Sequence, residues 1–239
     1  MCGRYTLTTP AEVLHDVFGF VERPNLPARY NIAPSQEAPV MRQRRQPKGE
    51  RTVQSLRWGL IPSWAKDARI ASSLINARAE TLSSRPAFAK ALRQRRCAAL
   101  ADGFYDWSGE GAARQPYLVT RRDGAPFAFA GLWDRWIERR DGAATPVDTF
   151  TIVTTAANEL LRQLHPRMPV ILTGAALDAW LDPESNPVRI AAALRGAPSA
   201  ALRYVPVSKR VNSARVDEPE LAAPVGPETV GMDAGASIQ

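Results

Sequence analysis

The chain has 239 residues, a length that allows one large domain or two small ones, each with a substantial hydrophobic core. Apolar residues make up 45% and charged residues 23%, as in ordinary globular proteins, and no apolar run is long enough to span a membrane. The net charge of +7 suits a polyanionic partner, but it equally suits an arginine-rich enzyme without one.

The predicted elements are short and mostly sequential. From the N-terminus we expect an extended segment 1–9, a helix 10–18, a loop 19–37, strands 38–43 and 52–58 around the basic hairpin loop 42–51, and helices 79–82 and 86–95. Strands follow at 97–107, 117–121, 127–136, 149–155, 168–172 and 202–207, with helices at 158–164, 175–181 and 188–194. This order predicts an α+β fold, a single compact domain on a mainly antiparallel, barrel-like sheet with short flanking helices.

The two ends of the chain carry different signals. The first residues, MCGRYTLTTPAEVLHDVF, lack the basic-then-apolar pattern of a secretory signal, which predicts a cytoplasmic protein. Residues 223–239 have few large apolar groups and are predicted to be a disordered tail, so that the domain would span residues 1–222.

The chain has two cysteines, Cys2 and Cys97, and two histidines, His15 and His165. Their spacing matches no zinc-ligand pattern, so we expect no metal and no cofactor. A reducing cytoplasm also disfavours a disulfide between the two cysteines.

Cys2 is the first candidate for chemistry. Met before a small residue is commonly removed, and Cys2 would then carry both a free amine and a thiol. The reference pKa is about 7.7–8.0 for an α-amine and about 8.5 for a thiol, so both are partly deprotonated near neutral pH. An aldehyde would form a Schiff base with the amine, and the thiolate would then close a thiazolidine; an N-terminal-nucleophile hydrolase is also possible chemistry. The alternative is an incidental cysteine at a frayed terminus.

Other polar residues lie at the ends of predicted elements. Asn76 precedes a helical turn, where it acts as a cap or positions the N-terminus, and Glu80 lies in the first turn. Asp106 lies in DGFYDW, where a buried carboxylate would have a raised pKa and act as a general acid, unless it only closes a turn. His165 lies at a helix-to-strand junction, as a proton shuttle or as a surface cap.

Tryptophans are candidates to stack on unpaired bases, with arginines nearby to hold phosphates. The alternative is that they belong to the core, as we expect for Trp133, Trp136 and Trp180. The candidates for stacking are Trp58, Trp64 and Trp107.

Eight blocks in a fixed order together resemble the SOS response-associated peptidase (SRAP) family. They are MCGRY, RYNIAPSQ, WGLIPSW, INARAET, ADGFYDW, FTIVTTAAN, LHPRMPVIL and PVSKRVN, and the resemblance covers about residues 1–222. It implies a compact α+β domain with a positively charged DNA channel. It also implies shielding of abasic sites in single-stranded DNA through a thiazolidine at the N-terminal cysteine. Family members were first proposed to be thiol peptidases that remove their own initiator Met.

Carried over position by position, the resemblance implies a role for each matching residue. Cys2 would be the nucleophile, Asn76 would orient it and contact the opened sugar, and His165 would handle protons. Asp106 stands where the family usually has Glu, so the shorter side chain would act through a water, or ring opening of the sugar would be slower with cross-link formation largely intact. Pro166 stands where an acidic residue is common, which affects the hydrogen bonding near His165. DNA would be bound by Arg4, Pro34, Trp58 or Trp64, Arg78, Trp107, Thr154 and Arg167.

Three hypotheses for function follow, in order of preference. The first is a sensor that cross-links covalently to abasic sites in single-stranded DNA. The second is a thiol peptidase acting on itself or on other chains, and the third is a non-covalent single-strand-binding module with salt-sensitive affinity. We expect a monomer that acts in the cytoplasm, is associated with the nucleoid when bound to DNA, and does not contact a membrane.

Overall fold

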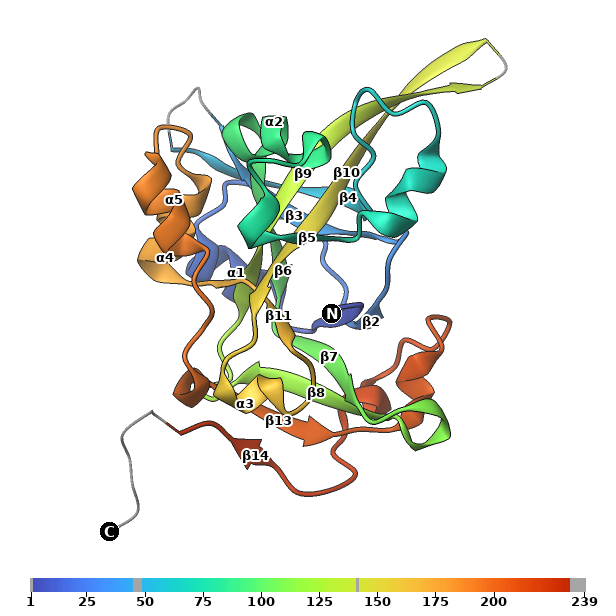
Figure 1. Cartoon of the computed structure of the whole chain (residues 1–239), viewed down its shortest axis with the longest axis vertical. Helices are drawn as coiled ribbons and strands as arrows, with labels where there is room; N and C mark the ends of the chain where they lie inside the picture. The colour runs from blue at the N-terminus through green and yellow to red at the C-terminus, as the bar shows by residue number, and fades with distance from the viewer. Residues whose placement is uncertain (1, 45–48, 141, 233–239) are drawn as a thin grey trace.

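A closed barrel and a second sheet below it make up most of the computed structural model, which describes residues 2–44, 49–140 and 142–232 (Figure 1). The barrel closes because β9 pairs with both β6 and β10, while β10 pairs in parallel with β4. The remaining barrel strand, β3, pairs antiparallel with both β4 and β6. The barrel strands are β3 (Glu37–Gln43), β4 (Arg51–Trp58), β6 (Arg96–Ala101), β9 (Phe127–Arg140) and β10 (Ala143–Ala156).

Three short strands extend the barrel at its edges. Both β5 (Asn76–Arg78) and β11 (Arg167–Pro169) pair with β10, in parallel and antiparallel respectively, whereas β12 (Ile171–Leu172) pairs with β9. Two sequence motifs that are distant along the chain, INARAET and LHPRMPVIL, therefore meet on one barrel strand.

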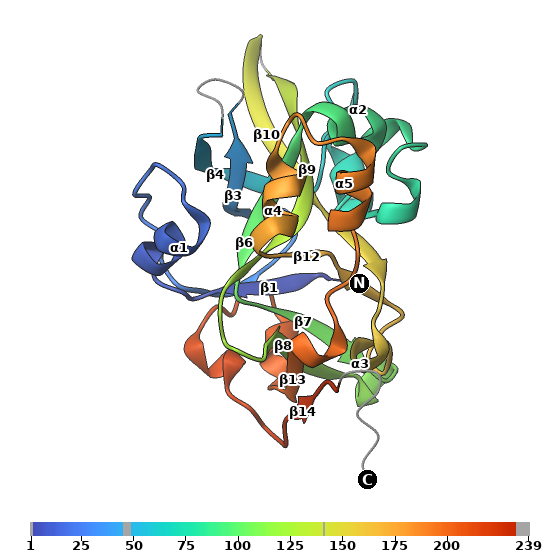
Figure 2. The same ribbon diagram turned by 90° about the vertical axis from the view of Figure 1, so that its left-hand side faces the viewer.

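The second sheet is antiparallel and has the order β14-β13-β8-β7-β1-β2. It lies below the barrel, and β1 passes between the two layers (Figure 2). Its strands are β1 (Arg4–Leu7), β2 (Arg29–Ile32), β7 (Gly103–Ser108), β8 (Gln115–Arg121), β13 (Leu202–Pro206) and β14 (Thr229–Val230).

Helices α1, α2, α4 and α5 lie around the barrel, whereas α3 lies beside the second sheet (Figures 1 and 2). The α-helices are α1 (Ala11–Phe18), α2 (Pro86–Gln94), α3 (Glu159–Arg162), α4 (Gly174–Leu181) and α5 (Pro187–Ala193). The 3-10 turns are η1 (Ala68–Ser73), η2 (Ala79–Thr81), η3 (Gly111–Ala113), η4 (Ser199–Ala201), η5 (Lys209–Asn212) and η6 (Pro219–Ala222). No helix among the described residues is long and apolar enough to cross a membrane.

An aromatic cluster joins the two layers. Phe129 of β9 contacts Tyr5 of β1 edge-on at 5.4 Å between ring centroids, and it also contacts Phe104 of β7 at 6.0 Å and Phe127 at 5.3 Å. All four side chains are fully buried. Because edge-to-face contacts add to the hydrophobic gain of burying these rings, this cluster fixes β1, and the cysteine just before it, against the barrel.

The predicted α+β fold with a barrel-like sheet is confirmed, but three details of the prediction are wrong. Segment 97–107 is two strands in different sheets, β6 and β7, separated at Asp102. The Asp102 carboxylate accepts hydrogen bonds from Thr6, Thr8 and Thr9, which ties this corner to the end of β1. Gly103 lets β7 begin this close to β1 because it has no Cβ. A Cβ at this position would lie 2.8 Å from the Thr6 hydroxyl.

The other two errors concern segments that contain few apolar residues. The predicted loop 19–37 contains β2, which pairs with β1. The predicted tail contains β14, which pairs with β13, and Pro224 forms a bridge to Val207. Ordered structure therefore continues to residue 232, since backbone hydrogen bonds attach this segment to the sheet edge; the rest of the predicted tail, 233–239, lies outside the described residues.

Candidate functional site

Cys2 lies just before β1, between the barrel and the second sheet, and it is fully buried. The Asn76 side-chain amide donates a hydrogen bond of 2.9 Å to the Cys2 carbonyl oxygen. Asn76 itself begins β5, whose backbone pairs with Ile152 of β10. The rim of the barrel therefore holds the backbone of the cysteine in place, and the predicted frayed terminus is not observed at Cys2.

Asp106 reaches the same place from the second sheet. Pairing of Arg4 with Tyr105 between β1 and β7 brings Asp106 beside the start of β1. Asp106 is only 4% exposed, and the Trp107 N–H donates a hydrogen bond of 3.0 Å to its carboxylate. Burial raises the pKa of the Asp106 carboxyl above its ordinary value, which favours its protonated form compared with an exposed carboxyl.

The Cys2 thiol is held in its protonated form in this arrangement. Burial raises the pKa of the thiol well above its ordinary value, and the nearby charge of Asp106 raises it further. A thiol in this state is a poor nucleophile until a proton acceptor is provided. The site therefore needs a group that can take the thiol proton as the sulfur reacts.

His165 approaches from the loop between α3 and β11 and is half-buried. The imidazole lies within electrostatic range of the Asp106 carboxylate, so a positive charge on the ring lowers the pKa of that carboxyl. The Arg167 backbone N–H donates a hydrogen bond of 2.9 Å to the imidazole Nδ1. The structure thus brings together all four predicted catalytic residues, Cys2, Asn76, Asp106 and His165, from segments far apart in the sequence.

Arg167 and Thr154 both have structural partners within the protein. The Arg167 guanidinium donates to both carboxylate oxygens of Glu80, at 2.6 and 3.0 Å, and to the Thr154 carbonyl at 2.6 Å. Thr154 is fully buried, so the prediction that it contacts DNA is wrong. Arg78, in contrast, is exposed at the end of β5 and available to a phosphate.

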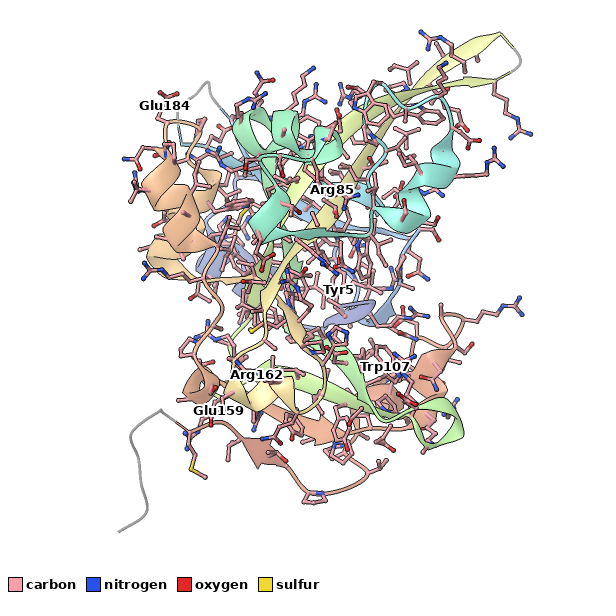
Figure 3. The ribbon with its side chains drawn as sticks, viewed as in Figure 1. Tyr5, Arg85, Trp107, Glu159, Arg162 and Glu184 are labelled. Carbon is pink, nitrogen blue, oxygen red and sulfur yellow. The ribbon has the colours of Figure 1, made fainter. Side chains whose placement is uncertain are left out.

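A basic depression of about 480 Å³ opens beside the cysteine. No acidic residue is among those that line it, and the Arg114 guanidinium lies 5.4 Å from the centre of the Trp107 ring. Figure 3 shows Trp107 on the second sheet, below Tyr5. The lining residues are Gly3, Arg4, Trp107, Gly111, Arg114, Lys209 and Asn212.

Trp107 is held by a partner that the sequence did not indicate. Its indole N–H donates a hydrogen bond of 2.8 Å to the Asn212 side-chain oxygen. Asn212 and Lys209 belong to the PVSKRVN block but have no individual signal, and Arg114 lies outside every block. Only the pairing of β7 with β8 shows that Arg114 comes close to Trp107.

The remaining predicted DNA contacts are not gathered at this depression. Trp58 is fully buried and its indole donates to the Ile75 carbonyl, so the prediction that it stacks on a base is wrong. Trp64 is 59% exposed, but it borders a different depression together with Lys66 and Arg69. Pro34 is half-buried on the loop after β2.

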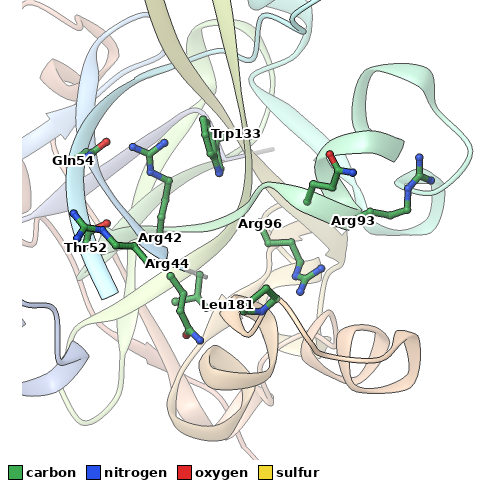
Figure 4. A pocket seen from close by; sticks show the side chains of 11 residues that line it. Arg42, Arg44, Thr52, Gln54, Arg93, Arg96, Trp133 and Leu181 are labelled. Atoms are coloured by element: carbon green, nitrogen blue, oxygen red, sulfur yellow. The ribbon is translucent and has the colours of Figure 1, made fainter. Parts of the chain in front are cut away.

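A separate basic cavity of about 220 Å³ lies on the barrel, away from the cysteine (Figure 4). Arg42 lies over the Trp133 ring, 4.2 Å from its centre, and is paired with Asp148. The Arg96 guanidinium donates to the Trp180, Leu92 and Asp182 carbonyls near the ends of α2 and α4. These guanidinium groups therefore have roles in the barrel wall, and none of the catalytic candidates lines this cavity.

Among the described residues, no three His, Cys, Asp or Glu side chains lie close enough together to hold a metal ion. The site contains instead a buried thiol, an amide that binds the backbone of the same cysteine, a carboxyl of raised pKa and an imidazole. Beside them lies the basic depression, which a half-buried tryptophan lines. This combination places a buried thiol near the N-terminus of the chain beside a surface of positive charge.

The chain belongs to the SOS response associated peptidase (SRAP) family, whose sequence profile matches residues 1–214. It is 38% identical to the abasic site processing protein YoqW of Bacillus subtilis, over 92% of this chain and 98% of that one. It is 33% identical to the abasic site processing protein HMCES of Gallus gallus, over 82% and 66% of the two chains.

Solved structures show the same architecture. A protein from Bacteroides thetaiotaomicron superimposes with a TM-score of 0.82 at 26% identity, over 94% of this chain and all (100%) of that one. A protein from Bordetella bronchiseptica superimposes with a TM-score of 0.70 at 28% identity, over 87% and 100% of the two chains. The resemblance inferred from the eight sequence blocks is thus confirmed.

Proposed function

We propose that this protein processes abasic sites in single-stranded DNA by covalent capture, forming a thiazolidine between Cys2 and the sugar aldehyde once Met1 is removed. The observation that carries the proposal is the position of Cys2. Its backbone is fixed by Asn76, it lies near Asp106, and the residues that follow it line a basic depression. The names of the similar proteins, which refer to abasic sites, support the same substrate.

The reaction uses the two nucleophiles of Cys2 in turn. The amine attacks C1′ of the opened sugar, the carbonyl electron pair moves to oxygen, and a proton passes from nitrogen to that oxygen. Loss of water from this carbinolamine gives the Schiff base. The thiol sulfur then bonds to C1′, the C=N electron pair returns to nitrogen, and nitrogen takes the thiol proton. One water is released overall, and no cofactor takes part.

Asp106 is the proton carrier in this proposal. Its raised pKa lets it hold the proton released by the attacking amine and return it to the oxygen that leaves as water. The buried thiol is protonated until the Schiff base forms, and the imine nitrogen then provides the acceptor that the thiol lacks in the resting site. Because Asn76 holds the Cys2 carbonyl, the amine and the thiol remain aligned on one carbon.

The DNA strand is proposed to lie in the basic depression. Arg4 and Arg114 would pair with phosphates, while Trp107, held by Asn212, would offer an edge or a face to an unpaired base. Exposed Arg78 would extend this surface past Asn76. We further propose that the protein acts as a monomer in the cytoplasm, on nucleoid DNA, as part of the response to DNA damage.

A denaturing gel with a labelled oligonucleotide that carries one abasic site tests the proposal. Wild type should give a slowly migrating covalent product, and Cys2→Ala should give no stable product. Cys2→Ser keeps the amine but not the thiol, so we expect only a Schiff base that borohydride can trap. Cys97→Ser, which changes the other buried cysteine, is the matched control and should cross-link like wild type. A stable product from Cys2→Ala would show that the proposal is wrong.

A further inference from the structure

The hydrogen bonds of His165 determine which ring nitrogen carries the proton in the neutral form. Nδ1 lies 2.9 Å from the Arg167 backbone nitrogen, which donates to it, and 3.2 Å from the Arg167 carbonyl oxygen. A backbone amide always carries its proton, so a protonated Nδ1 would face another donor at the shorter distance. Nδ1 is therefore the acceptor, and the proton of the neutral ring is on Nε2.

This tautomer is the reverse of the one that a cysteine–histidine peptidase needs. There, Nδ1–H is held by an acceptor, which leaves a lone pair on Nε2 to take the proton of the nucleophile. We propose that neutral His165 acts in this site as a hydrogen-bond donor through Nε2 and not as the base for the Cys2 thiol, with Glu80 as the positioning residue that holds this arrangement. The donor role in the reaction rests on the proposed function, because that function supplies the substrate. The tautomer does not depend on it.

Glu80 acts through Arg167. It lies in η2, just after the strand that carries Asn76, and it binds the Arg167 guanidinium through both carboxylate oxygens. The same guanidinium also donates to the Thr154 carbonyl and hydroxyl on β10, at 2.6 and 3.2 Å. With its side chain fixed at these points and its backbone two residues from His165, Arg167 has its N–H directed at Nδ1.

The hydrogen bond from Arg167 lowers the pKa of the Glu80 carboxyl, so this pair is ionised at neutral pH. The bidentate geometry resists rotation better than a single contact does. Substitution of Glu80 should therefore release the Arg167 side chain, loosen its backbone N–H and allow the second tautomer, in which Nδ1–H donates to the Arg167 carbonyl.

A donor at Nε2 has a defined task in the reaction. When the amine attacks the aldehyde, negative charge develops on the carbonyl oxygen, and an aligned N–H stabilises it as in an oxyanion hole. No proton moves to or from His165 in this role, because Asp106 carries it. The two residues thus divide the work between hydrogen-bond donation and proton transfer.

Nitrogen-15 NMR of the full-length protein labelled at histidine tests the tautomer without DNA. The chain has two histidines, so His15→Gln leaves His165 as the one histidine signal. At a pH high enough for the imidazole to be neutral, we expect a protonated Nε2 and an unprotonated Nδ1. A majority of the form protonated at Nδ1 would overturn the proposal, whatever the protein does to DNA.

Cross-linking rates test the donor role. His165→Gln keeps an N–H donor but cannot act as a base, whereas His165→Ala keeps neither property. We expect His165→Gln to react at least about tenfold faster than His165→Ala, since one such donor is commonly worth a hundredfold or more. Equal loss in the two variants would refute the donor role. Absence of any cross-link in wild type would instead refute the proposed function, and the NMR result would still stand.

Glu80→Gln tests the positioning role, with Glu80→Asp as the conservative rescue. The matched control is Glu228→Gln, which weakens another surface arginine–glutamate pair, Arg203–Glu228, on the second sheet. We expect Glu80→Gln to give a mixture of His165 tautomers and a lower cross-linking rate, with partial recovery in Glu80→Asp and no change in Glu228→Gln. A Glu80→Gln protein with the wild-type tautomer and rate would show that Glu80 does not position His165.

Discussion

The hydrogen bond from Asn76 to the Cys2 carbonyl gives the sharpest prediction about reactivity. Asn76→Ala removes the donor, so the backbone carbonyl of the fully buried Cys2 loses this hydrogen-bond partner. Asn76→Asp keeps the shape but places a carboxylate oxygen where the amide nitrogen now lies, 2.9 Å from the carbonyl oxygen. The substituted aspartate would also repel Asp106.

The expected size of the effect follows from this contact. An unsatisfied buried acceptor costs about 1–3 kcal/mol. Each 1.36 kcal/mol changes a rate about tenfold, so if the productive position of Cys2 is destabilised by this amount, cross-linking slows by about 5- to 150-fold. We expect Asn76→Asp to be at least as slow as Asn76→Ala, because it adds repulsion to the lost hydrogen bond.

The measurement is a single-turnover rate of cross-linking with excess protein on the abasic-site oligonucleotide. Asn186→Ala is the control, because Asn186 also has a structural role: it is the N-cap of α5, where its side-chain oxygen accepts a hydrogen bond from the Arg189 N–H. That change should cost about 1 kcal/mol of folding stability without slowing the reaction. If Asn76→Asp reacts within twofold of wild type while folded, the argument that Asn76 aligns the nucleophile is refuted.

Three other predictions concern carboxylates. Asp106→Glu should cross-link at least as fast as wild type in the same gel assay, and a clear loss would show that the site is built around the shorter acid. Asp102→Ala removes the acceptor of hydrogen bonds from Thr6, Thr8 and Thr9, and urea unfolding should show a loss of at least about 2 kcal/mol; an unchanged midpoint would contradict this. The pKa of Glu80 is lowered in the folded protein, so its pairing stabilises the fold above the ordinary carboxyl pKa of 4.5 and is lost as pH falls through the lower folded value. Amide hydrogen exchange of residues 165–169 should therefore become faster, relative to the exchange of β3, in that acidic range. No change there would argue that the Glu80–Arg167 pair does not hold this segment.

Several features of this protein follow from the sequence alone. The ordered blocks and the alternation of short strands and helices predicted the fold class and the family. Strands β3 and β4 begin and end within a residue of the prediction, whereas β9 and β10 form a longer hairpin than predicted. In 104–107, the alternation of side chains along β7 places Phe104 in the main core and Tyr105 and Trp107 with a second cluster. The segment β2 was missed because its pairing with β1, not its composition, makes it a strand.

The sequence also identified the four residues that meet at the site, but it did not determine what each of them faces. Arg167 was predicted to hold a phosphate and Thr154 to contact DNA. In the structure Arg167 is paired with Glu80, and Thr154 is buried. Trp58 is likewise a core residue, because at the end of β4 its ring packs against Tyr5 and Phe150.

The residue types, their order and the nucleophile at position 2 are properties of the chain itself, and the sequence determined them. The burial of Cys2, the raised pKa of Asp106 and the protonated nitrogen of His165 were decided only by the tertiary structure. The physical reason is that Cys2 meets Asn76 and Asp106 from more than 70 residues away along the chain, and the Arg167 N–H that faces His165 is held by Glu80, 87 residues away; strand pairing brings these groups together. Local sequence patterns extend over a few residues and contain no information about such partners.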